Sequence, residues 1–297
     1  MENTGIEFRK ERNFGDIFGS AIEFIRQEHK KFGFVILVYV LPFLVITSLV
    51  LILIQSNFLS ASRNISDMAT TGNYSYFGDF FFYYFLMLAC YVVAHTMLIT
   101  ATYGYVDLYV KKGKDGFESS DVWNRMRRFF FPVLGTNIVV GIITIIGFVF
   151  CLIPGIYLGI SLSLILIALI YENKGFGDAF SRSFDLTKRD WWVTFAIVLV
   201  ALLLVSALSY VIQLPAIIIG MGSFWTTMQE TISKPGSVSG EDMFSTTYIV
   251  VTSLLSVLTY ILYIIPHLIL SFQYFNLVER LEKPSLINRI EQMGQNE

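Results

Sequence analysis

The sequence predicts an all-α polytopic membrane protein with six transmembrane helices, because it is strongly apolar and its apolar residues form long uninterrupted runs. Of its 297 residues, 55% are hydrophobic and 15% are charged, whereas soluble domains carry roughly 25% charged residues. Each run reaches the ~20 residues that a helix needs to cross a ~30 Å hydrocarbon core. The six runs are Phe32–Ile54, Phe80–Val110, Phe130–Phe150, Leu152–Tyr171, Trp191–Ile219 and Tyr248–Leu277.

The basic residues give the predicted orientation. The stretches before, between and after the six runs hold 6, 1, 6, 0, 4, 1 and 3 Lys or Arg residues, so alternate stretches hold nineteen of the 21. Basic residues that flank membrane spans stay in the cytoplasm. We therefore expect a multi-pass protein of the cytoplasmic (inner) membrane with cytoplasmic N and C termini. The first apolar run is too long for a cleavable signal peptide.

The chain predicts one membrane domain, 1–297, built from three similar units. Each unit is a cytoplasmic amphipathic helix followed by two spans, and the sequences Phe14–Phe18 and Phe176–Phe180 open two of these helices with the same Phe-Gly-Asp start. We expect the N-terminal amphipathic helix within 1–31, six spans within 32–277, interfacial helices near 119–129 and 176–189, and a cytoplasmic tail over 278–297.

The proposed interfacial helices have an aromatic face and a charged face at the 100° helical spacing. In the third one, Phe176, Phe180 and Phe184 share a face, and charged residues that allow Asp178–Arg182 and Asp185–Arg189 pairs at i, i+4 lie opposite. In the first, the predicted apolar face is Phe14, Phe18, Ile22 and Ile25. Such helices can lie in the lipid interface, or can pack on the bundle as connectors.

The connections and prolines predict the course of the spans. Cys151–Gly155 contains Pro-Gly and predicts a tight hairpin between the third and fourth spans. The connections Gln55–Gly78 and Gly220–Thr247 are long. Three prolines (Pro42, Pro215 and Pro266) lie in or near spans, where a kink is expected.

Four polar residues form the candidate intramembrane site: His95, Asp107, Asn137 and His267. Ionisable residues at membrane depth are costly to bury and therefore suggest function. Hydrogen bonds inside the bundle account for the histidines equally well, and an ion pair with Lys111 or Lys112 accounts for Asp107. Two histidines alone make a poor metal site. No catalytic motif or phosphate-binding loop is present, so we expect no cofactor, metal or enzyme activity.

From Pro154 onward the chain resembles a known membrane domain. The matching residues are Pro154–Leu158, Glu172–Gly175, Ala179–Thr187 and Trp191-Trp192. They resemble the membrane domain attached to some bacterial glycerophosphoryl diester phosphodiesterases, and its six-helix bacterial relatives. The resemblance implies a membrane module, because the catalytic barrel of that family has no counterpart here. In the matching stretch, Arg182, Lys188, Arg189 and Trp191 are candidate lipid-headgroup contacts, with structural roles as the alternative.

These features favour a non-enzymatic membrane protein that organises lipids or partner proteins at the cytoplasmic face. The expected partners are membrane lipids and, as a second candidate, another membrane protein. Nothing in the sequence suggests nucleic-acid binding. A transporter or channel for a small or lipid-like substrate is the alternative, and an intramembrane lipid enzyme is a third, which requires at least two ionisable groups to meet in a cleft.

Overall fold

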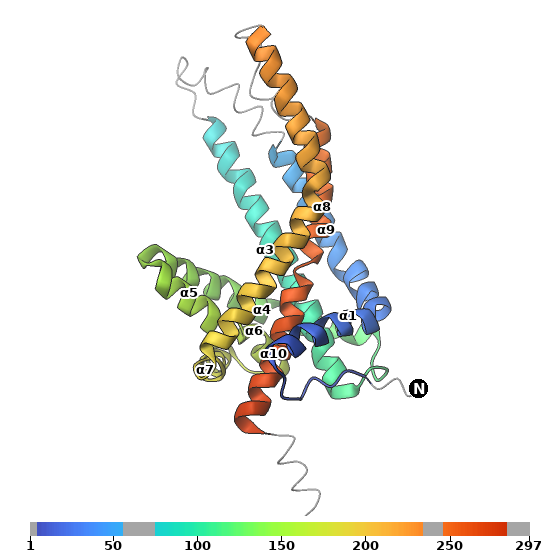
Figure 1. Cartoon of the computed structure of the whole chain (residues 1–297), viewed down its shortest axis with the longest axis vertical. Helices are drawn as coiled ribbons and strands as arrows, with labels where there is room; N and C mark the ends of the chain where they lie inside the picture. Colours follow the sequence, from blue (N-terminus) through green and yellow to red (C-terminus); the bar gives the residue numbers. More distant parts are fainter. Residues whose placement is uncertain (1–4, 56–74, 234–245, 284–297) are drawn as a thin grey trace, which may run out of the picture. The chain divides into compact units, whose positions relative to one another are not determined.

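The computed structural model describes residues 5–55, 75–233 and 246–283 (Figure 1). All regular secondary structure in these residues is helical, which confirms the all-α prediction. Within the same residues, six helical runs are long and apolar enough to cross a membrane: Phe14–Gln55, Phe81–Lys112, Ser119–Phe150, Leu152–Tyr171, Trp191–Ser233 and Thr246–Glu282. The chain is therefore a multi-pass membrane protein by the length and composition of its helices.

The first run begins where the sequence predicts a helix start. Helix α1 (Phe14–Val35) opens with an acidic first turn, in which the Asp16 carboxylate accepts a hydrogen bond from the Asn13 N–H at 3.3 Å. The run then widens into a π-helical segment, η1 (Ile36–Val40), just before Pro42. Proline has no N–H and clashes with the carbonyl four residues earlier, and a π-helical turn is one way for a helix to accommodate such a disturbance.

The middle of the chain forms a long helix, a hairpin and a short crossing helix. Helix α3 spans Ser75–Lys112 and α4 spans Ser119–Phe150, so the predicted interfacial segment 119–129 is the first part of one continuous helix. After Cys151, α5 (Leu152–Ser161) returns beside α4, which confirms the predicted hairpin (Figure 1). A break at 162–164 separates α5 from α6 (Ile165–Tyr171), and α7 covers Phe176–Thr187.

The last part contains α8 (Trp191–Ser233), α9 (Thr246–Ile261) and α10 (Ile264–Glu282). Helix α8 continues past Gly220, so the first part of the connection predicted at Gly220–Thr247 is helical; the rest, 234–245, lies outside the described residues, as do 56–74. Pro266 lies in the first turn of α10, where its missing N–H is tolerated, and the helix is interrupted just before it. Of the predicted tail 278–297, only 278–283 are described, and α10 extends through most of these residues.

The described residues group into two compact units. The first comprises the chain up to Val40, His95–Val205 and the part from Tyr263 onward; the second comprises Leu41–Ala94 and Ser206–Leu262. The η1 segment and the interruption between α9 and α10 both fall at boundaries between these units. Irregular backbone thus coincides with two of the passages between the units, whereas α3 and α8 pass from one unit to the other as regular helix.

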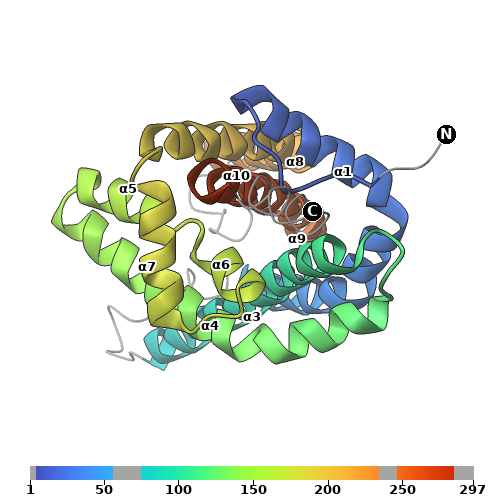
Figure 2. The ribbon, with the colours of Figure 1, turned by 90° about the horizontal axis from the view of Figure 1, so that it is seen from below.

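The core of the first unit contains three helical segments that are buried on nearly all sides: residues 95–109 of α3, α6, and α10. Helices α1 and α7 both pack on α10, and α7 also packs on α6 (Figure 2). An aromatic cluster joins α1 to α10. The ring of Phe8 stacks on Phe272 with centroids 4.2 Å apart and meets Phe24 edge-on with centroids 5.3 Å apart. These contacts anchor the segment before α1 to the last helix.

The second unit exposes much apolar surface. Ile218 and Met221 on α8 are each 68% exposed, and Leu254 on α9 is 58% exposed. In a membrane protein such surface faces hydrocarbon, where exposure of apolar side chains carries no penalty. Polar contacts also link its helices: Gln213 donates to Thr259 at 3.3 Å, and the Thr47 hydroxyl donates to the Cys90 carbonyl at 3.5 Å.

The apolar face predicted for the first helix is not the face that packs into the protein. The core side of α1 is formed by Ile17, Ala21 and Phe24, whereas Phe14 and Ile22 on the predicted face are 41% and 57% exposed. The helix therefore carries apolar residues on two sides. The helical periodicity identified one of these sides, and periodicity alone does not distinguish the side that contacts protein.

Candidate functional site

Three of the four predicted intramembrane polar residues come together in the first unit. His95 lies on α3, Asn137 on α4 and His267 on α10. The Asn137 side-chain N–H donates to His95 Nδ1 at 3.2 Å, and the two imidazole rings meet edge-to-face with centroids 5.7 Å apart. Tyr103 Oη lies 3.0 Å from His267 Nδ1 and completes the cluster.

We call these four residues the histidine cluster. Tyr103 gave no sequence signal, because it is one of 16 tyrosines and lies in an apolar helix. An amide nitrogen can only donate, so in this arrangement His95 Nδ1 is the acceptor of the hydrogen bond from Asn137. Within the described residues, no group of three or more His, Cys, Asp or Glu side chains could hold a metal ion. The arrangement is suited to hydrogen bonding or proton transfer.

Asp107 does not belong to the histidine cluster. Its carboxylate is 1% exposed and pairs with Lys111 Nζ at 2.6 Å and with Arg125 Nη2 at 2.6 Å. The pair with Lys111 is the one that the i, i+4 spacing predicts. The pair with Arg125 joins α3 to α4, and Arg125 also donates to the Ile170 carbonyl of α6 at 3.4 Å. Asp107 therefore fixes three helices together.

A second buried carboxylate, Glu28, was not expected from the sequence. It is 2% exposed, accepts a hydrogen bond from Tyr105 Oη at 2.6 Å and lies 3.6 Å from Lys114 Nζ. In the sequence Glu28 lies between the polar residues Gln27 and His29, so the helical pattern does not indicate that it is buried. Its partners lie far away in sequence, so only the tertiary structure reveals this contact.

Arg182 pairs with different carboxylates from the one predicted. Its guanidinium lies 2.7 Å from Glu172 and also contacts Glu282, whereas the i, i+4 partner Asp178 is exposed and forms no ion pair within the described part of the chain. Because α7 packs on α6 and α10, acidic residues at the ends of those helices reach Arg182 first. A guanidinium engaged with two carboxylates is a poor candidate for a lipid phosphate.

The same ion pairs change the ionisation of Glu172. Burial by itself would raise its pKa, but hydrogen bonds from Lys174, Tyr274 and Arg182 outweigh burial, and the pKa of Glu172 is lowered. The charged form is thus favoured. Glu172 and Arg182 act as a structural ion pair between α6 and α7.

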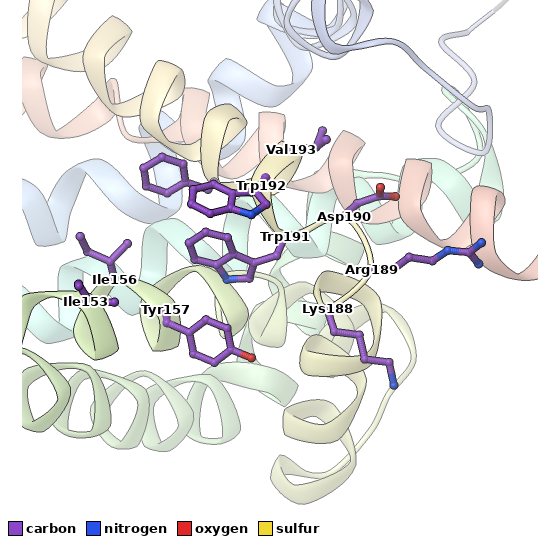
Figure 3. Close-up of a pocket in the computed structure, with 10 residues that line it drawn as sticks. Ile153, Ile156, Tyr157, Lys188, Arg189, Asp190, Trp191, Trp192 and Val193 are labelled. Carbon is purple, nitrogen blue, oxygen red and sulfur yellow. The ribbon is translucent and has the colours of Figure 1, made fainter.

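The other three predicted headgroup contacts, Lys188, Arg189 and Trp191, lie together in a groove (Figure 3). The groove has a volume of about 610 Å³, within the range of ligand sites. We call it the cationic groove. It is lined by residues of α5, of the turn after α7 and of the start of α8: Ile153, Ile156, Tyr157, Lys188, Arg189, Asp190, Trp191, Trp192, Val193 and Phe195.

Aromatic stacking holds the wall of the cationic groove in place. The Trp191 ring stacks on Phe195 with centroids 5.5 Å apart and on Tyr157 at 5.7 Å. Ser183 on α7 is fully buried and donates to the Ser161 carbonyl at 2.6 Å. This close contact between small residues positions the end of α7, and with it the turn that carries Lys188 and Arg189.

The charges of the cationic groove are only partly neutralised. Lys188 pairs with Asp185 at 2.6 Å, but both side chains are more than 60% exposed, so water screens the pair. Asp190 faces Arg280 at 3.4 Å. Arg189 is exposed and has no ion-pair partner among the residues that the structure describes. The groove therefore presents positive charge beside exposed aromatic rings.

No protein-family model, curated protein or solved structure matches this chain.

Proposed function

We propose that the chain is a non-enzymatic integral membrane protein that organises anionic lipids at the cytoplasmic face of the inner membrane. Both termini lie in the cytoplasm in this proposal, as the distribution of basic residues favours. Kinship with the membrane domain of the glycerophosphoryl diester phosphodiesterase family remains part of the same proposal. A membrane-embedded partner protein is the second candidate ligand of this face.

The observation that carries the proposal is a division among the cations of the first unit. Arg125 contacts a buried carboxylate and supports the fold. In contrast, Arg26, Lys30, Arg127 and Arg189 are exposed and have no ion-pair partner within the described ranges. Cations near an anionic lipid surface each contribute about 1 kcal/mol of attraction. Such cations are therefore available for lipid headgroups without loss of stability.

The test measures the lipids around the protein in a bilayer. Nanodiscs contain phosphatidylglycerol and phosphatidylcholine, and energy transfer from tryptophan to each labelled lipid reports its local concentration. We expect enrichment of phosphatidylglycerol that weakens from about 0.1 M to about 1 M salt, as the Debye length falls from ~10 Å to ~3 Å. Enrichment should also weaken when Arg26, Lys30, Arg127 and Arg189 are replaced by Gln, and should persist in the uncharged control Asn124→Gln. Equal amounts of both lipids around the wild-type protein would refute the proposal.

The orientation has its own test. Single cysteines at Lys112 and Lys188, in a background with Cys90 and Cys151 replaced by Ser, should react with a membrane-impermeant thiol reagent only from the cytoplasmic side. Labelling from the opposite side alone would contradict the orientation.

Transport is a second candidate function, because the histidine cluster gathers polar side chains from three spans. Polar residues at membrane depth are typical of substrate or proton pathways. A pathway requires water at the cluster. Asn137→Cys, in a background without Cys90 and Cys151, should then react with a small charged thiol reagent, whereas Ile142→Cys on the apolar surface of α4 should not. If neither cysteine variant reacts, the cluster is not reached by water, and its role is structural.

A further inference from the structure

The cationic groove has two chemically different ends. Figure 3 shows Lys188 and Arg189 extending from the end opposite Ile153 and Ile156, with the Trp191 ring between. One end therefore offers positive charge and the other offers aliphatic surface. A ligand that fills the groove must itself be anionic at one end and apolar at the other.

The apolar end of the groove continues into exposed apolar surface. Ile153 is 74% exposed, and Val149 and Phe150 at the tip of the same hairpin are 80% and 82% exposed. Trp192, on the opposite wall, is 75% exposed. Tryptophan is enriched at the boundary between hydrocarbon and headgroups. The groove thus passes from a charged end to an exposed apolar end, and this polarity matches that of a lipid molecule.

The start of α8 adds to the positive potential of the groove. Asp190 precedes the helix, and its carbonyl accepts a hydrogen bond from the Thr194 N–H at 3.0 Å. The three residues between them line the groove, and the N–H groups of a first helical turn have no partner within the helix. Together with the helix dipole they attract an anion. The Asp190 carboxylate is offset by Arg280, 3.4 Å away.

We propose that the cationic groove binds a single anionic glycerophospholipid. Its phosphate lies against Arg189 and Lys188, and the upper part of one acyl chain follows Trp191 and Tyr157 toward Ile156. This inference rests on the proposed function, because it identifies where on the cytoplasmic face a specific lipid is held. Two other ligands fit the groove less well. A soluble phosphate ester would contact only the cationic end, and a zwitterionic lipid would place its own positive charge near Arg189.

The test counts lipids bound to the protein in detergent, where no membrane surface potential acts. Native mass spectrometry compares retention of phosphatidylglycerol with that of phosphatidylcholine. The charge variant is Lys188→Gln with Arg189→Gln. Its matched control, Lys10→Gln with Arg128→Gln, removes the same charge from exposed sites that lie outside the groove and outside the set of cations proposed above to bind lipid headgroups. At about fivefold for each exposed cation–phosphate pair, the charge variant should bind phosphatidylglycerol about 30-fold more weakly, and the control should bind it as the wild type does.

A steric variant provides an independent measurement. Ile156→Trp fills the apolar end without a change in charge, so it should also reduce retention of phosphatidylglycerol. Thermal unfolding identifies any variant that fails to fold, and the single variant Arg189→Gln, at an exposed residue, then replaces it. Soluble glycerol phosphate should not compete with phosphatidylglycerol at equal concentration, because it lacks the acyl chain.

The failures of the groove and of the proposed function are distinguishable. Equal losses in the charge variant and its control, or equal retention of both lipids by the wild type, would overturn the groove as a specific site. So would effective competition by glycerol phosphate. Phosphatidylglycerol would still be enriched in nanodiscs after these results if all exposed cations of the basic face attract it without a specific site. No enrichment in nanodiscs would overturn the proposed function itself.

Discussion

Replacement of Asp107 by Asn should destabilise the first unit by about 3 kcal/mol. The carboxylate is 1% exposed, and each of its ion pairs, with Lys111 and Arg125, is 2.6 Å long. Removal of one partner from a buried pair costs about 3–5 kcal/mol, because the other charge remains buried and uncompensated. Lys111 is 43% exposed and can turn to water, but Arg125 is only 17% exposed and cannot do so fully. Its partial exposure places the estimate at the lower end of the range.

The free energy of unfolding in mixed micelles, titrated with a denaturing detergent, measures this loss. The exposed pair between Asp185 and Lys188 provides the control, because its members are 62% and 67% exposed; Asp185→Asn should leave stability unchanged. The double variant Asp107→Asn with Arg125→Met removes both charges and should regain more than half of the loss.

The refuting results are specific. A loss below about 1 kcal/mol for Asp107→Asn would place the pair among solvent-screened surface pairs. A double variant as unstable as the sum of the two single variants would show that Asp107 and Arg125 are not coupled. Either result would reject Asp107 as the residue that fixes α3, α4 and α6 together.

Three further predictions concern the first unit. The pKa of Glu172 is lowered from its ordinary value of 4.5, so charged Glu172 stabilises the fold above pH 4.5, and this stabilisation is lost as the pH falls through the lower folded-state pKa. The melting temperature should therefore fall less on acidification in Glu172→Gln than in the wild type. An equal fall in both proteins would contradict this. Ser183→Leu should destabilise the protein by about 1–3 kcal/mol through overpacking of a fully buried site, whereas Ser181→Leu, at an exposed position of α7, should not alter its melting temperature. Tyr105→Phe removes the hydroxyl that donates to buried Glu28 at 2.6 Å and should cost about 1–3 kcal/mol in the same detergent titration; an unchanged unfolding free energy would mean that Lys114 alone satisfies the carboxylate.

The helices and the hairpin could be predicted because they depend on local properties of the chain. Runs of apolar residues give spans, Pro-Gly after Cys151 gives a hairpin, and Phe-Gly-Asp gives the starts at Phe14 and Phe176. The break between α5 and α6 was not predictable in this way. The Ser161 carbonyl there accepts a hydrogen bond from Ser183 on α7, so a residue 22 positions later stabilises the irregular backbone.

The candidate sites show the same distinction. His95, Asn137 and His267 were identified singly, because each is costly at membrane depth, but their meeting depends on how α3, α4 and α10 pack. Arg182 was a candidate lipid contact because it lies in the stretch that resembles a known membrane domain, with a structural role as the alternative, and it contacts two carboxylates supplied by the ends of α6 and α10. Sequence spacing describes neighbours on one helix and contains no information about partners supplied by another.

The contrast between Arg182 and Arg189 determines how lipid-binding experiments on this protein must be interpreted. The two residues lie seven positions apart, Arg182 within α7 and Arg189 in the turn that follows it, and look alike in the sequence. Arg182 holds α7 through Glu172 and Glu282, so its loss would also displace the following turn and weaken lipid binding without any contact to lipid. Arg189 has no ion-pair partner in the described part of the chain, so its replacement removes charge and leaves the packing intact. Loss of a bound lipid is therefore evidence for the cationic groove when it follows from Arg189, and evidence only for the fold when it follows from Arg182.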